Sequence, residues 1–338
     1  MENRRIVLAS RPSGEPSQDN FRLERVPAPE PKEGEVLLRT RWLSLDPYMR
    51  GRMNDARSYA QPVAVGETMV GGTVSEVVES RAPGLSAGDL VSAYSGWQDY
   101  ATAPAAAVTR LPPQLDPPSY ALGVLGMPGF TAYHGLLKIG EPKAGETVVV
   151  AAATGGVGAV VGQVARIKGC RAVGIAGGPE KCSLATQTLG FDACIDHKGP
   201  DFPAQLAAAC PKGIDVYFEN VGGEVLQAVA PLLNDFARVP VCGLISRYNA
   251  ANMGAGGSGP SMDQLMALIL IHRLKVQGFI ISDAFAGIGE FQRDMAGWVA
   301  SGQVKYLEHK VKGLENAPAA FMGLLKGENR GKVVVEVA

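Results

Sequence analysis

A glycine-rich turn between an apolar strand and a helix constrains the fold of this chain more than any other feature. The run Thr147–Ala152 predicts a strand, Val157–Lys168 has helical spacing, and Arg171–Ala176 predicts a second strand. The turn itself reads Ala153-Thr154-Gly155-Gly156-Val157-Gly158. A strand, a helix and a strand within about thirty residues form a βαβ unit. The sequence therefore predicts a parallel sheet in this region.

The alternation of helices and strands continues toward the C-terminus, which predicts an α/β fold with a doubly wound parallel sheet. Helices are expected at 180–189, 202–209, from 223, at 261–274 and at 288–301, and strands at 193–196, 214–219, 238–242 and 276–281. Residues 35–100 instead contain short β-rich runs separated by Gly, Pro and Asp, which is typical of a small, mostly antiparallel domain. We expect this β domain to cover 1–125 and 305–338, with a closing strand at 332–337, and the doubly wound domain to cover 126–304. Met253–Gly259 is expected to form a mobile loop.

The bulk composition excludes several classes of protein. A formal net charge of −1 provides no field that would attract nucleic acid. The N-terminus does not resemble a signal peptide, and no apolar run is long enough to span a membrane, so a cytoplasmic protein is expected. The five cysteines form no C-x-x-C pair and are interpreted as small buried side chains rather than disulfides or zinc ligands.

The turn at 153–158 has the chemistry of a dinucleotide-binding site. A backbone that closely approaches a pyrophosphate and enters a helix N-terminus needs residues with little or no side chain. Gly155 and Gly158 occupy the second and third glycine positions of the G-x-G-x-x-G pattern, and Ala153 occupies the first. The alternative is a tight turn that binds no ligand.

The end of the second strand favours NADPH over NADH. NAD-binding proteins tend to have Asp or Glu there, about 20 residues beyond the turn. This chain has Ala176-Gly177-Gly178 and then Lys181, whose ammonium would offset the charge of a 2′-phosphate. Alternatively, Lys181 is a solvated lysine at the start of a helix. Glu180 is expected to face away from the site.

The β domain indicates a superfamily but lacks that superfamily's metal ligands. Gly66-Glu67-Thr68-Met69-Val70-Gly71-Gly72 and Gly88-Asp89-Leu90-Val91 resemble the medium-chain dehydrogenase/reductase superfamily. Its zinc alcohol dehydrogenases carry G-H-E where this chain has Val65-Gly66-Glu67, and no cysteine precedes Cys170. A catalytic zinc normally has three protein ligands, so no metal is expected and alcohol dehydrogenation is disfavoured. The four histidines are scattered, and each is interpreted as structural or superficial.

Longer motifs narrow the resemblance to the zinc-independent leukotriene/prostaglandin reductase and plant double-bond reductase branch. They are Asp46-Pro47-Tyr48-Met49-Arg50-Gly51, Gly126-Met127-Pro128-Gly129-Phe130-Thr131-Ala132-Tyr133, Phe218-Glu219-Asn220-Val221-Gly222-Gly223 and Cys242-Gly243-Leu244-Ile245-Ser246-Arg247-Tyr248-Asn249. Within that branch, the bacterial NADPH-dependent curcumin/dihydrocurcumin reductases are most similar in four further segments: Ala152 to Gly162, Lys168-Gly169-Cys170-Arg171, Ile195-Asp196-His197 and Gly313 to Gly327. The resemblance implies a GroES-like β domain, a Rossmann domain for NADPH, and reduction of a carbon–carbon double bond conjugated to a ketone or aldehyde.

The resemblance also implies roles for particular residues. Lys181 would reach the 2′-phosphate, Phe279 to Ile281 would flank the nicotinamide, and Asn329 would close on it. The full expected cofactor set is Ala153, Thr154, Gly155, Gly156, Val157, Gly158, Gly177, Lys181, His197, Asn220, Cys242, Gly243, Ile245, Ser246, Tyr248, Phe279, Ile280, Ile281 and Asn329. Many animal and plant members have Tyr where His197 stands, and an imidazole can also stack or donate a hydrogen bond.

Reduction of an enone places negative charge on the carbonyl oxygen, so the site needs a hydrogen-bond donor there. Tyr248 is the first candidate, for enolate stabilisation or proton transfer, although it could be a structural loop tyrosine. Tyr48 is the second, as an aromatic that positions the substrate. Quinone reduction and non-catalytic NADPH binding remain alternatives. A homodimer is expected if the strand predicted at 276–281 lies at the edge of its sheet.

Overall fold

The computed structural model describes residues 1–56, 58–250 and 258–338, so most of the loop expected at Met253–Gly259 lies outside the described residues. Two compact units are present. Among the described residues, the first unit comprises 1–56, 58–126, 248–250 and 308–338, and the second comprises 127–247 and 258–307. Each unit has its own sheet and its own core, and each is described separately below.

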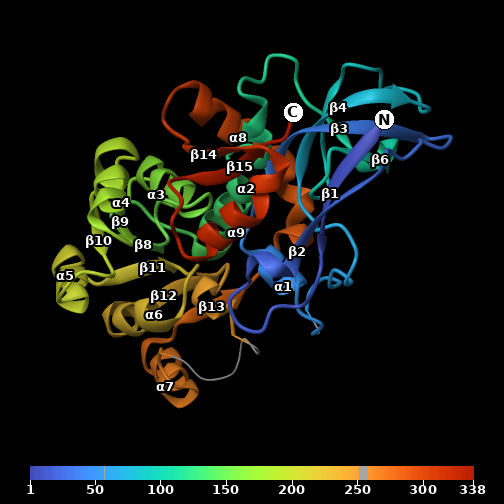
Figure 1. Cartoon of the computed structure of the whole chain (residues 1–338). Coiled ribbons are helices and arrows are strands. Elements are labelled where there is room, and N and C mark those ends of the chain that lie inside the picture. Colours follow the sequence, from blue (N-terminus) through green and yellow to red (C-terminus); the bar gives the residue numbers. More distant parts are fainter. Residues whose placement is uncertain (57, 251–257) are drawn as a thin grey trace. The chain divides into compact units, whose positions relative to one another are not determined.

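The second unit is built on a six-stranded sheet with the order β10-β9-β8-β11-β12-β13 (Figure 1). Its strands are β8 (Thr147–Ala151), β9 (Arg171–Ala176), β10 (Ala193–Asp196), β11 (Ile214–Phe218), β12 (Leu233–Val241) and β13 (Lys275–Gly278). Every strand pair is parallel. In sequence order this is the arrangement 3-2-1-4-5-6: successive strands are added on one side of β8 as far as β10, and on its other side from β11 onward. The expected doubly wound sheet is confirmed.

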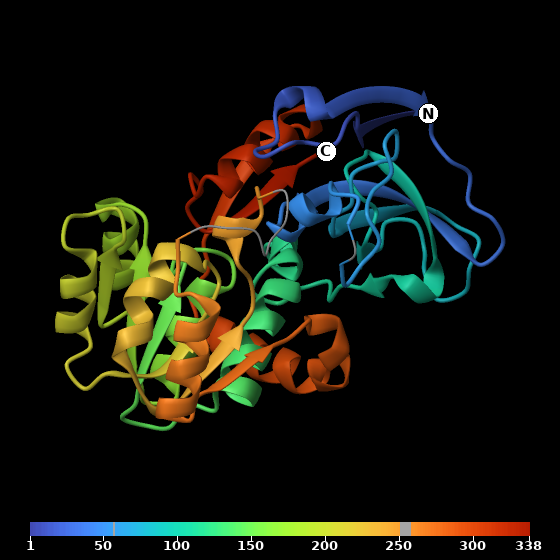
Figure 2. The ribbon, with the colours of Figure 1, turned by 90° about the horizontal axis from the view of Figure 1, so that it is seen from below.

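Alternating side chains explain why helices cover both faces of this sheet (Figure 2). Val149 and Ala151 point to one face, where they join a buried cluster with residues of α5 (Phe202–Ala209) and α6 (Gly223–Val229). On the other face, α3 (Gly158–Ile167) packs against β8 and β9. Each fully buried valine of this kind stabilises the folded state by roughly 1.5–3 kcal/mol relative to an exposed one. A strand buried on both faces is therefore continuously apolar, as 147–151 is.

The remaining helices of the second unit are α2, α4, α7 and α8. Their bounds are α2 (Met127–His134), α4 (Pro179–Ser183), α7 (Met262–His272) and α8 (Ile288–Ala300). The helix expected at 180–189 is wrong as a single α-helix, because the α-helical bonds end at Ser183 and a π-helical turn covers Leu184–Thr188. A second π-helical turn, Gly135–Gly140, follows α2.

The strand expected at 276–281 is also wrong at its C-terminal end. β13 pairs only with Arg238–Val241 of β12 and ends with Gly278. Because β12 ends at Val241, a longer β13 would have no strand to bond with. Phe279 and Ile280 therefore lie between β13 and the 3₁₀ helix η8 (Ile281–Gly287).

The first unit contains a two-stranded and a seven-stranded sheet. The small sheet pairs β1 (Glu2–Leu8) with β2 (Phe21–Pro27). The larger has the order β14-β15-β3-β4-β5-β7, with β6 paired to β3. Its strands are β3 (Glu35–Ser44), β4 (Thr73–Ser80), β5 (Leu90–Ala93), β6 (Tyr100–Pro104), β7 (Thr109–Arg110), β14 (Glu308–Lys312) and β15 (Lys332–Glu336). Among these pairs β14–β15 is parallel and the others are antiparallel.

An aromatic core holds the first unit together. Phe21 stacks on Trp97 with ring centroids 5.7 Å apart, and the edge of Phe321 meets Trp97 at the same separation. Phe321 belongs to α9 (Ala317–Leu325), and α1 (Tyr48–Arg52) contributes Met49 to the same core. Short 3₁₀ helices connect the elements of both units at Gln18–Asn20, Ala105–Ala107, Pro118–Leu122, Ala230–Leu232, Ile245–Arg247 and Leu314–Asn316.

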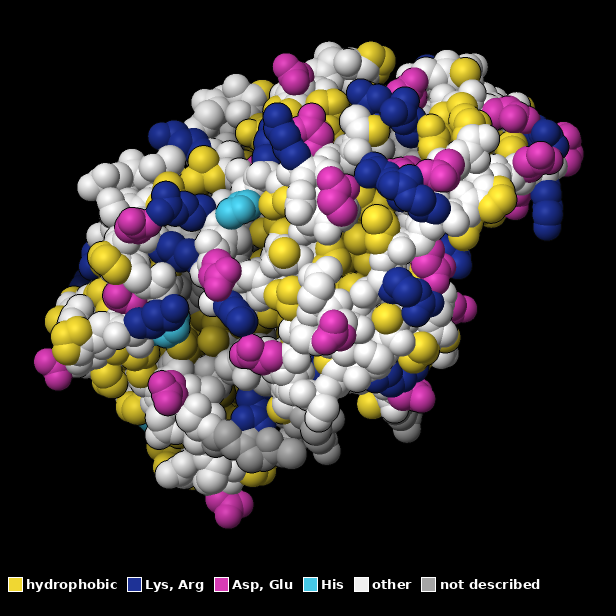
Figure 3. Space-filling model, in the orientation of Figure 1, with side chains coloured by type: hydrophobic (Ala, Val, Ile, Leu, Met, Phe, Trp, Pro, Cys, Tyr) yellow, Lys and Arg dark blue, Asp and Glu magenta, His cyan; other side chains and the backbone are white. Residues whose placement is uncertain are grey.

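The surface carries no extended area of one charge on the face shown in Figure 3, where basic and acidic side chains are interspersed. In the described parts of the chain, no helix combines the length and the apolar character needed to cross a bilayer. The five cysteines are free thiols. Cys170 and Cys210 are buried as expected, but Cys182, Cys194 and Cys242 are partly exposed.

Candidate functional site

The candidate residues of the second unit follow the ends of its parallel strands. The 153–158 turn follows β8, Gly177 follows β9, His197 follows β10, Asn220 follows β11, the segment 242–246 follows β12, and Phe279 and Ile280 follow β13. The carboxyl ends of parallel strands lie at one edge of the sheet, which is where open α/β sheets bind ligands. The fold therefore brings these residues to one edge. Lys181 lies one helix turn further on, in α4.

The turn after β8 accepts only glycine at its last position. A Cβ atom on Gly158 would lie 2.2 Å from the carbonyl oxygen of Ala152, and one on Gly155 would lie 3.3 Å from it. Ala153 and Thr154 are buried, whereas Gly155, Gly156 and Val157 are partly exposed. No side chain caps the first turn of α3. The first N–H groups of a helix attract anions, so this cradle fits a dinucleotide pyrophosphate.

A side-chain hydrogen bond links the ends of the two central strands, β8 and β11. The amide Nδ2 of Asn220 donates to the carbonyl oxygen of Ala151 at 2.8 Å, which links the end of β11 to the end of β8. Asn220 is held by Glu219, whose buried Oε1 accepts from the backbone N–H groups of Val221 and Gly222 at 2.6 and 2.8 Å. Burial raises the pKa of the Glu219 carboxyl. This network fixes the loop beside the glycine turn.

The segment after β12 is bonded to the same loop. The N–H of Cys242 donates to the carbonyl oxygen of Glu219 at 2.9 Å, and that of Ile245 donates to Asn220 at 3.1 Å. Ser246 donates to Val221 through both its N–H and its hydroxyl. Burial raises the pKa of the Cys242 thiol to about 12. The backbone of 242–246 is thus aligned along the edge of the sheet.

Loops after β9 and β10 meet where the 2′-phosphate is expected. Asp196 joins them, because its Oδ1 accepts from the N–H groups of Gly178 and Lys198 at 2.8 and 2.9 Å. A Cβ on Gly177 would lie 3.1 Å from both His197 Nε2 and Lys198 Cε. Burial, followed by the charge of Lys198, lowers the pKa of His197, and Lys181 acts in the same direction. Two lysines therefore lie near the His197 ring.

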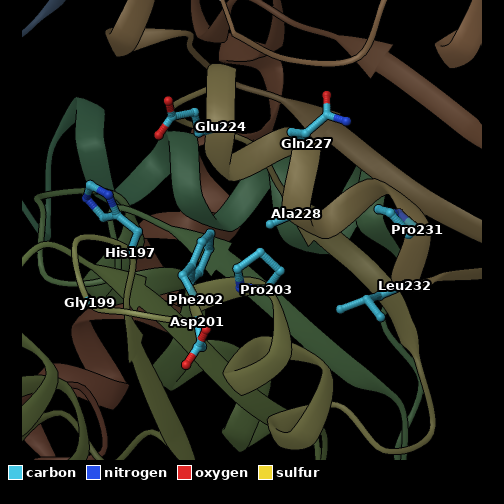
Figure 4. Close-up of a pocket in the computed structure, with 10 residues that line it drawn as sticks. All are labelled: His197, Gly199, Asp201, Phe202, Pro203, Glu224, Gln227, Ala228, Pro231 and Leu232. Carbon is cyan, nitrogen blue, oxygen red and sulfur yellow. The ribbon is translucent and has the colours of Figure 1, made fainter.

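A cavity of about 480 Å³ begins at His197 (Figure 4). His197 and Glu224 lie toward one end of it, and Pro231 and Leu232 lie toward the other. Its walls come from the loop after β10, the start of α5, α6 and the 3₁₀ helix Ala230–Leu232. The lining residues are His197, Gly199, Asp201, Phe202, Pro203, Glu224, Gln227, Ala228, Pro231 and Leu232. The edge of the imidazole faces Phe202 with centroids 6.5 Å apart. The volume of this cavity is within the range of small-molecule sites.

Phe279 packs into an aromatic group beside the end of β11. Its ring lies 6.4 Å from that of Phe218 and 5.8 Å from that of His134. The rings of Phe218 and Phe279 also pack closely against Gly135, just after α2, where a Cβ would lie 2.7 Å from each of them. The aromatic packing holds Phe279 and Ile280 at the end of the sheet. Ile281 begins η8 instead of ending a strand.

The remaining predicted residues belong to the first unit. Asn329 is buried, and its Nδ2 donates to the carbonyl oxygen of Gly331 at 2.6 Å. Tyr248 follows the 3₁₀ helix Ile245–Arg247 and groups with the first unit. Tyr48 begins α1, and its Oη lies 3.0 Å from the Oη of Tyr94. Burial, and then the charge of Asp46, raise the pKa of Tyr48 above its usual range.

A buried ion pair fixes the backbone just before Tyr48. The Nζ of Lys332 donates to Asp46 Oδ1 at 2.7 Å and to the carbonyl oxygen of Leu45 at 2.6 Å. Ser44 donates to the other carboxylate oxygen of Asp46. The Lys332 and Asp46 side chains are 3 % and 9 % exposed, so neither charge is compensated by water. Burial lowers the pKa of Lys332, while Asp46 favours the charged ammonium.

Residues of these arrangements that were not predicted from the sequence include Tyr94, Asp196, Lys198 and Lys332. Lys198 directly follows His197, and this adjacency was the only available signal for it. Tyr94 and Lys332 reach Tyr48 and Asp46 through sheet pairing across 46 and 286 positions. No local pattern encodes such contacts. Within the described residues, no group of three or more His, Cys, Asp or Glu side chains could hold a metal ion.

The fold and the site together define a dinucleotide-dependent oxidoreductase. Two family models match the chain: "N-terminal domain of oxidoreductase" over residues 4–111 and "Zinc-binding dehydrogenase" over residues 156–301. The chain belongs to the medium-chain dehydrogenase/reductase superfamily and, within it, to the branch that contains the prostaglandin reductases.

Similar proteins share the whole length of the chain. It is 59% identical over 337 residues to the NADPH-dependent curcumin reductase of Escherichia coli (strain K12), covering 99% of this chain and 97% of the relative. Prostaglandin reductase 1 of Bos taurus is 40% identical, with 96% and 95% covered. The crystal structure of CurA from Vibrio vulnificus in complex with NADPH is 58% identical, has a TM-score of 0.95, and covers 99% of each chain.

Proposed function

We propose that this protein uses NADPH to reduce the carbon–carbon double bond of α,β-unsaturated ketones and aldehydes. The observation that carries the proposal is the 59% identity, across nearly the whole chain, to a curcumin reductase that is NADPH-dependent. The structure supports NADPH through the glycine cradle after β8 and through two lysines beside Gly177. No acidic residue stands at Gly177 itself, where NAD-binding proteins tend to place one.

The chain's residues would hold the cofactor in three places. The backbone of 154–158 would bind the pyrophosphate, and His197 with Lys181 and Lys198 would surround the adenosine 2′-phosphate. The 242–246 segment, Asn220, and Phe279 to Ile281 would line the nicotinamide half, and Asn329 would close on it. When bound, NADPH supplies the hydride that adds to the β-carbon of the substrate.

Tyrosine hydroxyls would complete the reaction. Addition of a hydride at the β-carbon moves negative charge onto the carbonyl oxygen, and a positioned O–H group stabilises that charge. We assign this role to Tyr248, with Tyr48 at the second position beside the substrate. Tyr48 is suited to donation because its raised pKa keeps the phenol protonated at every working pH.

A substrate panel tests the proposed function. NADPH oxidation is followed with aryl enones, alkenals and quinones under identical conditions. Turnover of enones and enals well above that of quinones supports double-bond reduction. Preferential turnover of quinones would replace it with quinone reduction, and NADPH binding without oxidation of any member would indicate a non-catalytic protein.

Lys181→Ala tests the recognition of the 2′-phosphate. A charge-assisted hydrogen bond contributes about 1.5–3 kcal/mol, so its loss should raise the KM for NADPH by roughly 10- to 100-fold. The KM for NADH should remain within about twofold of the wild-type value, because NADH lacks this phosphate. Lys212→Ala serves as the control, since Lys212 is an exposed lysine between α5 and β11 of the same unit. An equal rise for both cofactors would contradict the assignment.

We also propose that two copies of the chain associate through β13 and α7. β13 lies at the edge of its sheet, and all four of its residues are exposed. On α7, Met262, Met266 and Leu270 repeat every fourth position and therefore form one stripe, with exposures of 72%, 55% and 78%. β13 follows α7 in the chain, and an exposed edge strand preceded by a helix with an apolar stripe fits pairing with a second copy.

Leu270→Glu should dissociate this dimer with little effect on folding, because the side chain is exposed within one chain. Light scattering coupled to size-exclusion chromatography should give twice 35.4 kDa for the wild type and 35.4 kDa for the variant. Leu23→Glu, on exposed β2 of the other unit, should remain dimeric. A monomeric wild type would refute the proposed dimer.

A further inference from the structure

The hydroxyl groups of two tyrosines meet in the first unit. Tyr48 Oη and Tyr94 Oη are 3.0 Å apart, a distance at which either can donate to the other. Tyr48 packs against the aromatic core of the unit. Tyr94 follows the end of β5 and is 56% exposed. The pair therefore connects a partly buried tyrosine to one that is largely open to water.

The surroundings of Tyr48 fix the position of its ring and favour its protonated form. Its position follows from Asp46, two residues earlier, which Lys332 and Ser44 bind from two sides. Asp46, Tyr94 and Tyr59 all act on Tyr48 to raise its pKa, so they disfavour a phenolate. After giving up a proton, Tyr48 would therefore be re-protonated at once if a donor were in contact with it. The Tyr94 hydroxyl, 3.0 Å from that of Tyr48, is such a donor.

We propose that Tyr48 and Tyr94 form a proton relay, in which Tyr94 passes a solvent proton to Tyr48 and Tyr48 delivers it to the α-carbon of the substrate. The inference rests on the proposed function. Hydride addition breaks the π bond, forms the β-carbon C–H bond, and leaves an enolate. The Tyr48 O–H bond then breaks as the α-carbon C–H bond forms, the Tyr94 proton moves to Tyr48, and water re-protonates Tyr94. One hydride from NADPH and one proton from water thus account for the two hydrogens added.

In this relay Tyr48 is the catalytic residue, and Tyr94 acts through it. Tyr94→Phe keeps the ring and removes only the outer hydroxyl. We expect kcat with an aryl enone to fall about tenfold while KM stays within about twofold, since a positioned acid contributes on the order of 100-fold or more. We also expect a larger solvent isotope effect on kcat. Tyr48→Phe should lower kcat by about 100-fold.

The stereochemistry of protonation separates a relay from a structural role. In deuterated water the wild type should place deuterium on one face of the α-carbon, because the donor is fixed. Tyr94→Phe and Tyr48→Phe should give deuterium on both faces as water replaces the relay. Tyr100→Phe, in β6 of the same unit, is the matched control and should behave as the wild type.

Two outcomes would overturn the proposal, and they are distinguishable. If the wild type reduces the enone and Tyr94→Phe shows unchanged kcat, isotope effect and facial selectivity, the relay is refuted and the proposed function stands. If the wild type oxidises no NADPH with any enone, the proposed function fails and the relay falls with it. A drop in kcat together with mixed deuteration in Tyr94→Phe, absent in Tyr100→Phe, supports it.

Discussion

Gly158→Ala is expected to destabilise the protein and to abolish tight binding of NADPH. The new methyl group would lie 2.2 Å from the Ala152 carbonyl oxygen and 2.9 Å from its carbonyl carbon, so the backbone must move. Overpacking of this kind costs about 3 kcal/mol, which should appear as a lower Tm. The N–H groups at the start of α3 would be displaced and should lose at least one charge-assisted hydrogen bond to the pyrophosphate. NADPH binding should weaken by roughly 10- to 100-fold as a result.

The control for this substitution is Gly297→Ala in α8. A Cβ at Gly297 meets no atom within 4 Å, and alanine in a helix interior is more stable than glycine by about 0.5–1 kcal/mol. This variant should match or exceed the wild-type Tm and bind NADPH unchanged. Normal NADPH affinity in Gly158→Ala would show that the turn after β8 is only a tight connection, which was the alternative interpretation of its sequence.

Lys332→Met should strongly destabilise the first unit. It leaves the buried carboxylate of Asp46 with the Ser44 hydroxyl but without its counter-charge. Removing one partner of a buried ion pair costs about 3–5 kcal/mol, measurable by urea unfolding. Arg81→Met is the control: Arg81 pairs with Glu79 on the surface, where both side chains are nearly half exposed, and an exposed pair contributes under about 1 kcal/mol.

The double variant Asp46→Asn with Lys332→Met tests whether the cost comes from the unpaired charge. Without the carboxylate, the apolar methionine no longer faces a buried charge. The double variant should therefore lose much less free energy of unfolding than the sum of the losses in the two single variants. Additive losses would mean that the two charges do not interact, contrary to the 2.7 Å contact between them.

The sequence predicted most of the second unit because its elements have strong local signals. β9 and β10 begin and end where expected, since each is an apolar run that ends at a glycine or a charged residue. The prediction failed where pairing decides the outcome. β13 ends at Gly278 because β12 ends at Val241, and a periodicity in 276–281 carries no information about its neighbour.

The site shows the same limit. The glycine turn, Gly177 and His197 follow strands that could be located from their composition, so their convergence at the carboxyl edge was predictable. Contacts that depend on strand pairing were not. The Tyr48–Tyr94 pair requires β5 to lie near α1, and the Asp46–Lys332 pair requires β15 to lie beside β3. Both are consequences of sheet topology in the first unit.

The position of a transferred deuterium tests the proposed function most directly. An aryl enone is incubated with the protein and NADPH that carries deuterium at the transferred position, and the product is examined by NMR. We predict a saturated ketone with one deuterium at the β-carbon and an intact carbonyl group. Deuterium on the carbonyl carbon, as an allylic alcohol, or an unlabelled substrate with no NADPH consumed, would contradict reduction of the conjugated double bond.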